Sequence, residues 1–293
     1  MVVRQLLKRG DFAAWVDVEP LGKAQSYTAI LSILREVFNE LDEIIRHKRG
    51  RFSAWRKALS AIEGQLSGDI NNLVEPLRKG IAEITKSLDR NIYVFLDDAH
   101  YIGVKYQPLL YDVIFRILKG NRGWLKIAAV RNLAKTFDNA QNIGLQVNQD
   151  LEEISLDLTL ENPGAAREHL IKIMGSFLNR CGIRKRSELI GGAAIDRLVW
   201  CSAGVPRDFL QILNLAIHEA RESKRQRISV QDINLAVGKF SDRKLQDLDE
   251  EAPEVSAQLK ECLKVIQQLC LDTNRTNAFL AKNDIQEAAE KVA

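Results

Sequence analysis

The spacing of apolar and polar positions along the first 160 residues predicts buried strands separated by helices. Five consecutive apolar residues, Ile92 to Leu96, predict a strand buried on both faces, as in the centre of a parallel sheet. Further strands are predicted at Phe12 to Val18, at Trp124 to Val130 and, from an alternation of apolar and polar positions, at Glu153 to Leu160. Strands that alternate with helices are typical of a parallel α/β sheet.

The stretches between these strands have the spacing of amphipathic helices. The clearest helix is predicted from Tyr27 to about His47, where apolar residues recur at helical spacing. Gly10 closes what looks like the end of a helix over residues 1–9. The other helices of this part are predicted near Phe52 to Glu63, Asp69 to Leu88 and Tyr106 to Leu118.

After Asn162 the pattern changes and predicts only helices. Asn162 and Pro163 are typical of an N-cap followed by proline, and Ser229 with Asp232 three residues on resembles a capping box. The predicted helices run over Pro163 to Cys181, Gly192 to Ser202, Pro206 to Lys224, Ser229 to Phe240, Val255 to Leu271 and Asp284 to Val292. An acidic linker is predicted from Asp242 to Pro253. We therefore expect an α/β domain at 1–160, a helical domain at 161–240, and a linker with a helical tail at 241–293.

The composition is that of an ordinary globular protein, with 46% hydrophobic and 28% charged residues. A net charge of +3 is too small to indicate nucleic-acid binding by itself. The four cysteines have no CxxC spacing, which predicts reduced thiols and, because no signal-peptide pattern is present, a cytoplasmic protein. No apolar run approaches the length that spans a membrane, so no membrane partner is expected.

Two carboxylates, Asp97 and Asp98, follow the central apolar run directly. Acids at the end of a buried strand cost desolvation energy unless a cation or a hydrogen-bond donor compensates them. The carboxyl ends of such strands are also where open α/β sheets bind ligands. One aspartate in this position suits Mg²⁺ and the second can orient a water, although a buried strand before a polar turn would show the same residues. The next predicted strand also ends in polar residues, Arg131 and Asn132.

Four features in this order carry a resemblance to a known family. They are a helix–strand start, the acid-tipped strand in the position of a Walker B segment, the polar-tipped strand, and Gly204-Val205-Pro206-Arg207 at a helix start. Over about residues 1–240 the chain resembles AAA+ ATPases of the origin-recognition and replication-initiator type, or their STAND relatives. The resemblance implies a parallel-sheet, P-loop NTPase-like α/β domain followed by an all-helical lid, with ATP and Mg²⁺ as cofactors.

The resemblance also implies roles for particular residues. Asp97 would hold Mg²⁺, and Asp98 would be the catalytic acid, where the family more often has Glu. Asn132 would be the sensor-1 polar residue, with Arg131 a neighbouring candidate for nucleotide binding. Arg207 would be the sensor-2 arginine that reaches the γ-phosphate, because a guanidinium suits phosphate oxygens. A helix-start arginine in a surface loop is the alternative for Arg207.

The phosphate-binding loop of this family is missing from the sequence. No Gly-x-x-x-x-Gly-Lys-[Ser/Thr] occurs, and the Gly22-Lys23 pair has neither the first glycine nor the hydroxyl residue of that motif. The loop supplies the backbone N–H groups and the lysine that hold the β- and γ-phosphates. We therefore expect an N-terminally truncated product whose sheet lacks its first strand, and which binds ATP weakly or not at all.

Three functions fit these residues. The first is an initiator-type AAA+ switch in which ATP and Mg²⁺ control binding of DNA or a protein partner. The second is a non-hydrolysing interaction or regulatory subunit, which includes self-association through an AAA+ interface. The third is a DNA-binding module whose α/β core is only a scaffold. The basic runs Arg184 to Arg186 and Lys224 to Arg227 could touch phosphates, but solvated helix ends are the simpler explanation for both.

Overall fold

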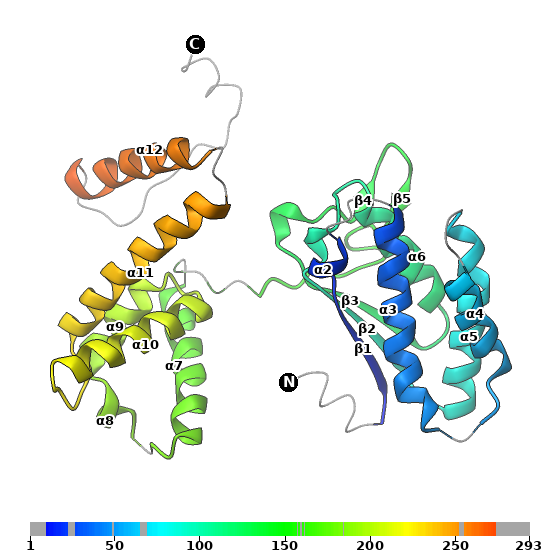
Figure 1. Ribbon diagram of the computed structural model, residues 1–293, viewed down its shortest axis with the longest axis horizontal. Coiled ribbons are helices and arrows are strands. Elements are labelled where there is room, and N and C mark those ends of the chain that lie inside the picture. The colour runs from blue at the N-terminus through cyan, green and yellow to red at the C-terminus, as the bar shows by residue number, and fades with distance from the viewer. Residues whose placement is uncertain are drawn as a thin grey trace, which may run out of the picture. The chain divides into compact units, whose positions relative to one another are not determined.

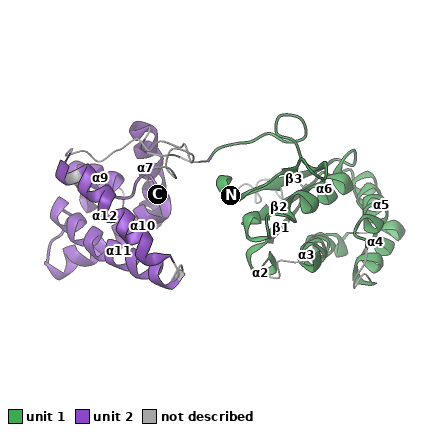
Figure 2. Ribbon diagram, turned by 90° about the horizontal axis from the view of Figure 1, so that it is seen from above, with its two compact units in different colours: residues 1–155 green, residues 156–293 purple. Residues whose placement is uncertain are grey.

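The structure is a computed structural model that describes residues 10–22, 27–48, 50–64, 69–156, 158, 160, 162–183, 185–251 and 255–273. Its contacts divide the chain into two compact units, residues 1–155 (unit 1) and residues 156–293 (unit 2), which Figure 2 shows in different colours. The helix expected over residues 1–9 and the one expected from Asp284 to Val292 lie outside the described residues.

Unit 1 contains a three-stranded parallel sheet. Its strands are β1 (Phe12–Asp17), β2 (Ile92–Asp97) and β3 (Gly123–Ile127), in the order β1-β2-β3. Phe12 pairs with Ile92 and Asp17 with Asp97, whereas Ile92 also pairs with Gly123 on the other side. The mixed α/β class and the three strands are therefore confirmed, with the acid-tipped strand in the middle.

Helices pack against one face of this sheet (Figure 1). The helices of unit 1 are α2 (Glu19–Gly22), α3 (Tyr27–Arg46), α4 (Ser53–Gly64), α5 (Asn71–Leu88) and α6 (Gln107–Leu118). The apolar stripe of α3 is buried against β1, and Trp55 of α4 stacks on Phe38 of α3 with ring centroids 5.2 Å apart. Val94 and Leu96 of β2 point into this core and are at most 1% exposed. The helical spacing of the sequence thus located the long helices of this unit.

The opposite face of the sheet carries aromatic side chains that the described helices leave partly exposed. Trp15 stacks on Phe95 with centroids 5.5 Å apart, and Tyr93 stacks on Trp124 with centroids 5.2 Å apart. Trp15 and Trp124 are 46% and 42% exposed. The prediction that Ile92 to Leu96 is buried on both faces is therefore wrong, because alternate residues of β2 are only half-buried. Large aromatic residues gave the run its apolar character without full burial.

The fourth predicted strand, Glu153 to Leu160, is also wrong for the residues of it that are described. Residues 153–156, 158 and 160 have no strand pairing, and Ile154 and Leu156 are 72% and 85% exposed. An alternating pattern gives a strand only where a neighbouring strand accepts its hydrogen bonds, and none of the described strands pairs with these residues. A small antiparallel hairpin of β4 (Phe137–Asp138) and β5 (Ile143–Gly144) lies beside α6 instead.

Unit 2 is helical throughout its described part. Its helices are α7 (Pro163–Arg180), α8 (Arg186–Leu189), α9 (Gly192–Cys201), α10 (Pro206–Glu222), α11 (Val230–Glu251) and α12 (Ser256–Gln267), followed by the π-helical turn η3 (Gln268–Thr273). Leu170, Leu198, Phe209 and Ile233, from α7, α9, α10 and α11, are fully buried in one core. The predicted N-cap forms, because the Ala165 N–H donates to Asn162 Oδ1 at 3.1 Å.

The acidic linker predicted from Asp242 to Pro253 is wrong over its described residues, since α11 continues to Glu251. Charged residues with good helix propensity fill this stretch, and ion pairs hold it. Lys244 pairs with Asp208 of α10 at 3.6 Å, and Asp249 pairs with Lys260 of α12 at 2.5 Å. Within the described ranges, no helix is both long and apolar enough for a membrane span.

Candidate functional site

The carboxyl end of the sheet gathers aspartates from two strands. Asp97 ends β2, and Asp17 lies at the same register position on β1. Both side chains point to the aromatic face, because they follow Phe95 and Trp15 by two residues. Asp98 comes next with φ 51, a left-handed conformation that turns the chain sharply away from the strand. Asp17 was not predicted as a site residue, although both strands visibly end in aspartate in the sequence.

Local hydrogen bonds fix these carboxylates. The Asp98 N–H donates to Asp97 Oδ1 at 3.1 Å, and the Glu19 N–H donates to Asp17 Oδ1 at 3.0 Å. The Val18 N–H donates to the Asp97 carbonyl at 3.0 Å, which keeps the two strand ends together. Asp97 is half-buried, whereas Asp17 and Asp98 are exposed. Each bonded aspartate therefore keeps a second carboxylate oxygen that no described residue engages.

The turn after β3 lies against the loop that follows β2. The Ala99 N–H donates to the Ala128 carbonyl at 3.0 Å, and the Val130 N–H donates to His100 Nδ1 at 3.4 Å. The turn then forms a short 3₁₀ helix, η2 (Arg131–Leu133). Asn132 is exposed within it and forms no side-chain hydrogen bond with another described residue. Arg131 forms an ion pair with Glu153 at 2.9 Å, so its guanidinium is already engaged.

Gln107, at the start of α6, forms hydrogen bonds with both the loop after β2 and the turn after β3. Its amide group donates to the carbonyls of Ile102 at 3.0 Å and Leu133 at 3.1 Å, and accepts from the Lys135 N–H at 2.7 Å. The side chain is 0% exposed. Tyr111, one helical turn further on, donates to the Ala99 carbonyl at 3.4 Å, and burial raises the pKa of its hydroxyl far above the ordinary value. Sequence reasoning did not find either residue, since a lone glutamine in a helix forms no pattern.

A small hollow lies beside Asp97 on the aromatic face. Its lining includes Trp15, Phe95, Asp97 and Lys126, and its volume is about 80 Å³. This is too small to enclose a nucleotide, because ligand pockets span roughly 300–1,000 Å³. Nowhere among the described residues do three or more His, Cys, Asp or Glu side chains come together as a metal-binding group. One or two carboxylates are nevertheless the usual protein ligands of Mg²⁺ where a nucleotide supplies the rest, so Asp97 fits that partial role.

The Gly22-Lys23 pair does not form a phosphate cradle in its described part. Gly22 ends the short helix α2, and its N–H donates to the Val18 carbonyl at 2.7 Å. A Cβ at this position would lie 2.9 Å from backbone atoms of Tyr101 and Ile102. Gly22 is thus required for close packing of α2 on the loop after β2, and the carboxylate end as described does not fit a whole triphosphate.

Arg207 lies in unit 2, in the first turn of α10. It is exposed and forms no ion pair with another described residue. The preceding turn depends on Gly204, which has φ +82 and at which a Cβ would collide with the Leu158 carbonyl oxygen. Backbone conformation and packing alone therefore explain why the Gly-Val-Pro-Arg segment has a glycine at position 204. Asp97, Asp98, Arg131 and Asn132 lie at the ends of adjacent strands in unit 1, whereas Arg207 belongs to unit 2.

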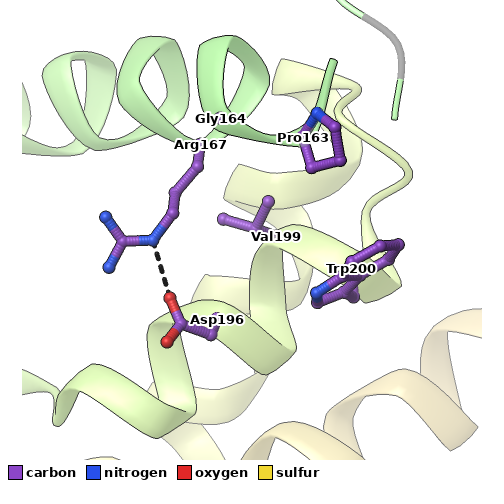
Figure 3. A pocket seen from close by; sticks show the side chains of 6 residues that line it. All are labelled: Pro163, Gly164, Arg167, Asp196, Val199 and Trp200. Atoms are coloured by element: carbon purple, nitrogen blue, oxygen red, sulfur yellow. Dashed lines mark hydrogen bonds and ion pairs between the residues drawn. The ribbon is translucent and has the colours of Figure 1, made fainter. Parts of the chain in front are cut away.

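Unit 2 also has an open hollow of about 370 Å³ between the start of α7 and the end of α9 (Figure 3). Val199 and Trp200 form its apolar side. Arg167 and Asp196 pair across it at 2.7 Å. Arg207 does not line this hollow. The pairing satisfies the charges of both side chains, which leaves the hollow's described lining without a free charged group to orient a ligand.

Comparisons with known proteins give one family match. The model of the FunZ-associated C-terminal helical domain matches residues 188–249, which run from α8 to near the end of α11. No curated protein matches the sequence. Among solved structures, the chain is similar to the RuvB Holliday junction branch migration motor of Thermotoga maritima, at 16% identity and a TM-score of 0.36, over 85% of this chain and 72% of that one. It is also similar to Drosophila ORC bound to DNA, at 14% identity and a TM-score of 0.37, over 99% of this chain and 75% of that one. TM-scores of this size do not establish a common fold, so only residues of this chain can support a function.

Proposed function

We propose that the chain is an AAA+-like switch module of the initiator type. The observation that carries the proposal is the acidic end of the middle strand, where Asp97 and Asp17 share a register position beside the exposed Asn132 turn. In this proposal Asp97 would hold Mg²⁺ and Asp98 would orient a water, and Asn132 and Arg207 are the candidates for contacts to phosphate oxygens. Arg131 is a weaker candidate, because Glu153 pairs with it. Magnesium would supply charge neutralisation of the phosphates.

The sequence contains no Gly-x-x-x-x-Gly-Lys-[Ser/Thr] loop to cradle the phosphates, so we expect the protein to bind ATP weakly. Calorimetry with ATP and Mg²⁺ should detect no binding tighter than about 1 mM, which corresponds to roughly −4 kcal/mol. An N-terminal extension with a strand, a Gly-x-x-x-x-Gly-Lys-Ser loop and a helix should then confer binding.

In that extended protein, Asp97→Asn should weaken the dependence of binding on Mg²⁺. The amide keeps the oxygen that accepts from the Asp98 N–H but loses the charge. Arg207→Gln should weaken ATP binding more than AMP binding, because AMP has no γ-phosphate. Asp242→Asn, an exposed carboxylate of α11, is the matched control and should change neither. Equal ATP binding by all three variants would contradict the proposal.

A second candidate function is that of an interaction subunit without nucleotide, in which the aromatic face of the sheet packs against the same face of a second copy. Large exposed apolar patches mark interaction sites, and parallel sheets are normally covered on both faces. Lys126 and Asp97 on one face also permit reciprocal ion pairs about a two-fold axis. Light scattering should then show a dimer that Trp15→Ser with Trp124→Ser converts to a monomer. Trp200→Ser, equally exposed in unit 2, is the control, and a monomer at every concentration of the unsubstituted chain would exclude this candidate.

A further inference from the structure

Two basic segments that are far apart in the sequence lie side by side in unit 2. Ile190, after α8, forms a parallel bridge with Ile228, before α11. The Ile228 N–H donates to the Leu189 carbonyl at 2.8 Å. Figure 1 shows α8 at the same end of unit 2 as the turn from α10 to α11. The bridge therefore places the charged residues next to Ile190 and those next to Ile228 on one surface.

We call this surface the basic end. It consists of the exposed side chains of Arg180, Lys185, Arg186, Arg221, Lys224, Arg225 and Arg227. Two exposed carboxylates, Glu188 and Glu222, lie within the same segments. A third acid, Asp232, is buried and already bonded to Arg225 and Ser229. Cations thus outnumber exposed carboxylates by a wide margin at this end, although the net charge of the chain is only +3.

Some of these cations have a structural role and some do not. Arg180 and Arg221 lie in the last turns of α7 and α10, where a positive charge complements the helix dipole. Arg225 donates to Asp232 at 2.6 Å and secures the start of α11. The remaining four, Lys185, Arg186, Lys224 and Arg227, form no ion pair with any other described residue.

The lysines elsewhere in unit 2 behave differently. Every other described lysine of this unit pairs with a carboxylate, namely Lys172, Lys239, Lys244, Lys260 and Lys264. Exposed pairs contribute little to stability, but they do cancel charge locally. Within the described part of unit 2, only the basic end keeps its lysine charges unpaired, on a turn held by the bridge and by the hydrogen bonds between Ser229 and Asp232. Fixed, unpaired cations are what a phosphate backbone binds by counterion release.

We propose that the basic end of unit 2 binds the phosphate backbone of duplex DNA without reading its sequence. The residues between the cations, Ser187, Ser223 and Gln226, are polar and exposed, so they offer no apolar group for insertion into a lipid surface. Arg207 lies at the opposite end of α10, about 25 Å away for a helix of this length. The proposed DNA-binding surface is therefore separate from Arg207, the residue assigned to nucleotide binding. A failure of DNA binding would leave the nucleotide proposal unaffected, and the reverse also holds.

The test uses the whole chain, a fluorescent 20-base-pair duplex and no nucleotide, and measures anisotropy between 50 and 200 mM salt. Two double variants test the basic end: Lys185→Gln with Arg186→Gln, and Lys224→Gln with Arg227→Gln. Each should weaken DNA binding about tenfold. Each should also reduce the slope of log K against log salt concentration by roughly 0.9 for each phosphate that the variant no longer neutralises. The matched control, Arg56→Gln with Lys57→Gln, removes the same charge from exposed positions of α4 and should leave both unchanged. A duplex of scrambled sequence should bind equally well.

Three results would overturn the proposal. The first is equal weakening by the control pair, which would mean that net charge alone attracts DNA. The second is no change of salt slope in either paired variant. The third is binding to phosphatidylserine vesicles that depends on these four residues while duplex binding does not. Circular dichroism checks that each variant keeps its helices, and because the substituted side chains have no described ion-pair partner, we expect no loss.

Discussion

The two units bury their apolar residues in different ways. In unit 2, helices α7, α9, α10 and α11 each turn an apolar stripe toward one shared core. In unit 1, described helices cover one face of a parallel sheet, and the other face presents two stacked aromatic pairs. A helix needs only one partner surface, whereas each parallel strand has two faces to cover. The described helices of unit 2 thus close their own core, while the described part of unit 1 leaves an apolar face next to the aspartates of its candidate site.

Substitutions on adjacent residues of β2 test this difference most strongly. Leu96 is 1% exposed on the covered face, and Leu96→Ala should lower the free energy of unfolding by about 3 kcal/mol, because the variant buries less apolar surface and leaves a cavity. Phe95, its neighbour, points to the aromatic face, and Phe95→Ala should cost about 1 kcal/mol, mostly from its stacking on Trp15. Urea denaturation followed by fluorescence measures both. Equal losses would mean that the aromatic face is covered in solution.

A smaller effect is expected from the polar anchor of the site loops. Gln107→Leu keeps the volume but removes the hydrogen bonds to Ile102, Leu133 and Lys135, and should cost about 2 kcal/mol because buried backbone groups lose their partners. Hydrogen exchange should accelerate in residues 100–102 and 131–135 before the rest of unit 1. Gln141→Leu, at an exposed position of the same unit, is the control and should change stability by less than about 0.5 kcal/mol. Uniform acceleration across unit 1 would argue against a local role for Gln107.

The sequence was sufficient for elements whose cause is local. The helices α3, α7 and α10 followed from apolar spacing, and the N-cap at Asn162 followed from residue type. The sequence was insufficient for features that depend on residues far away along the chain. Nothing near Ile154 reveals that none of the described strands pairs with it, and nothing near Gln107 reveals the backbone groups that its side chain satisfies. The acidic pair after β2 was visible from the sequence, but its companion Asp17 becomes meaningful only through the register of β1 and β2.

The capping box at the start of α11 is a local prediction that the structure confirms in both directions. Ser229 Oγ and N–H donate to Asp232 Oδ2 at 2.6 and 2.8 Å, and the Asp232 N–H donates back to Ser229 Oγ at 3.3 Å. Burial alone would raise the pKa of Asp232, but the hydrogen bonds from Ser229 and the charge of Arg225 outweigh it, so the pKa lies below its ordinary value of 3.8. The box therefore stabilises unit 2 through an ionised carboxylate.

Asp232→Asn should lower the stability of unit 2 by about 1.5 kcal/mol at pH 7, because the cap and the bond from Arg225 lose their charge. A group whose pKa is depressed in the folded state contributes its stability above the unfolded value and loses it as pH falls through the folded value. The difference between the two proteins should thus be constant above about pH 5 and shrink below pH 3.8. Urea denaturation at pH 7, 5 and 3.5 measures this, with Asp242→Asn on the same helix as the control. A difference that does not change with pH would show that Asp232 acts through shape and neutral hydrogen bonds, and the charge of Arg225 would then have no part in closing this end of unit 2.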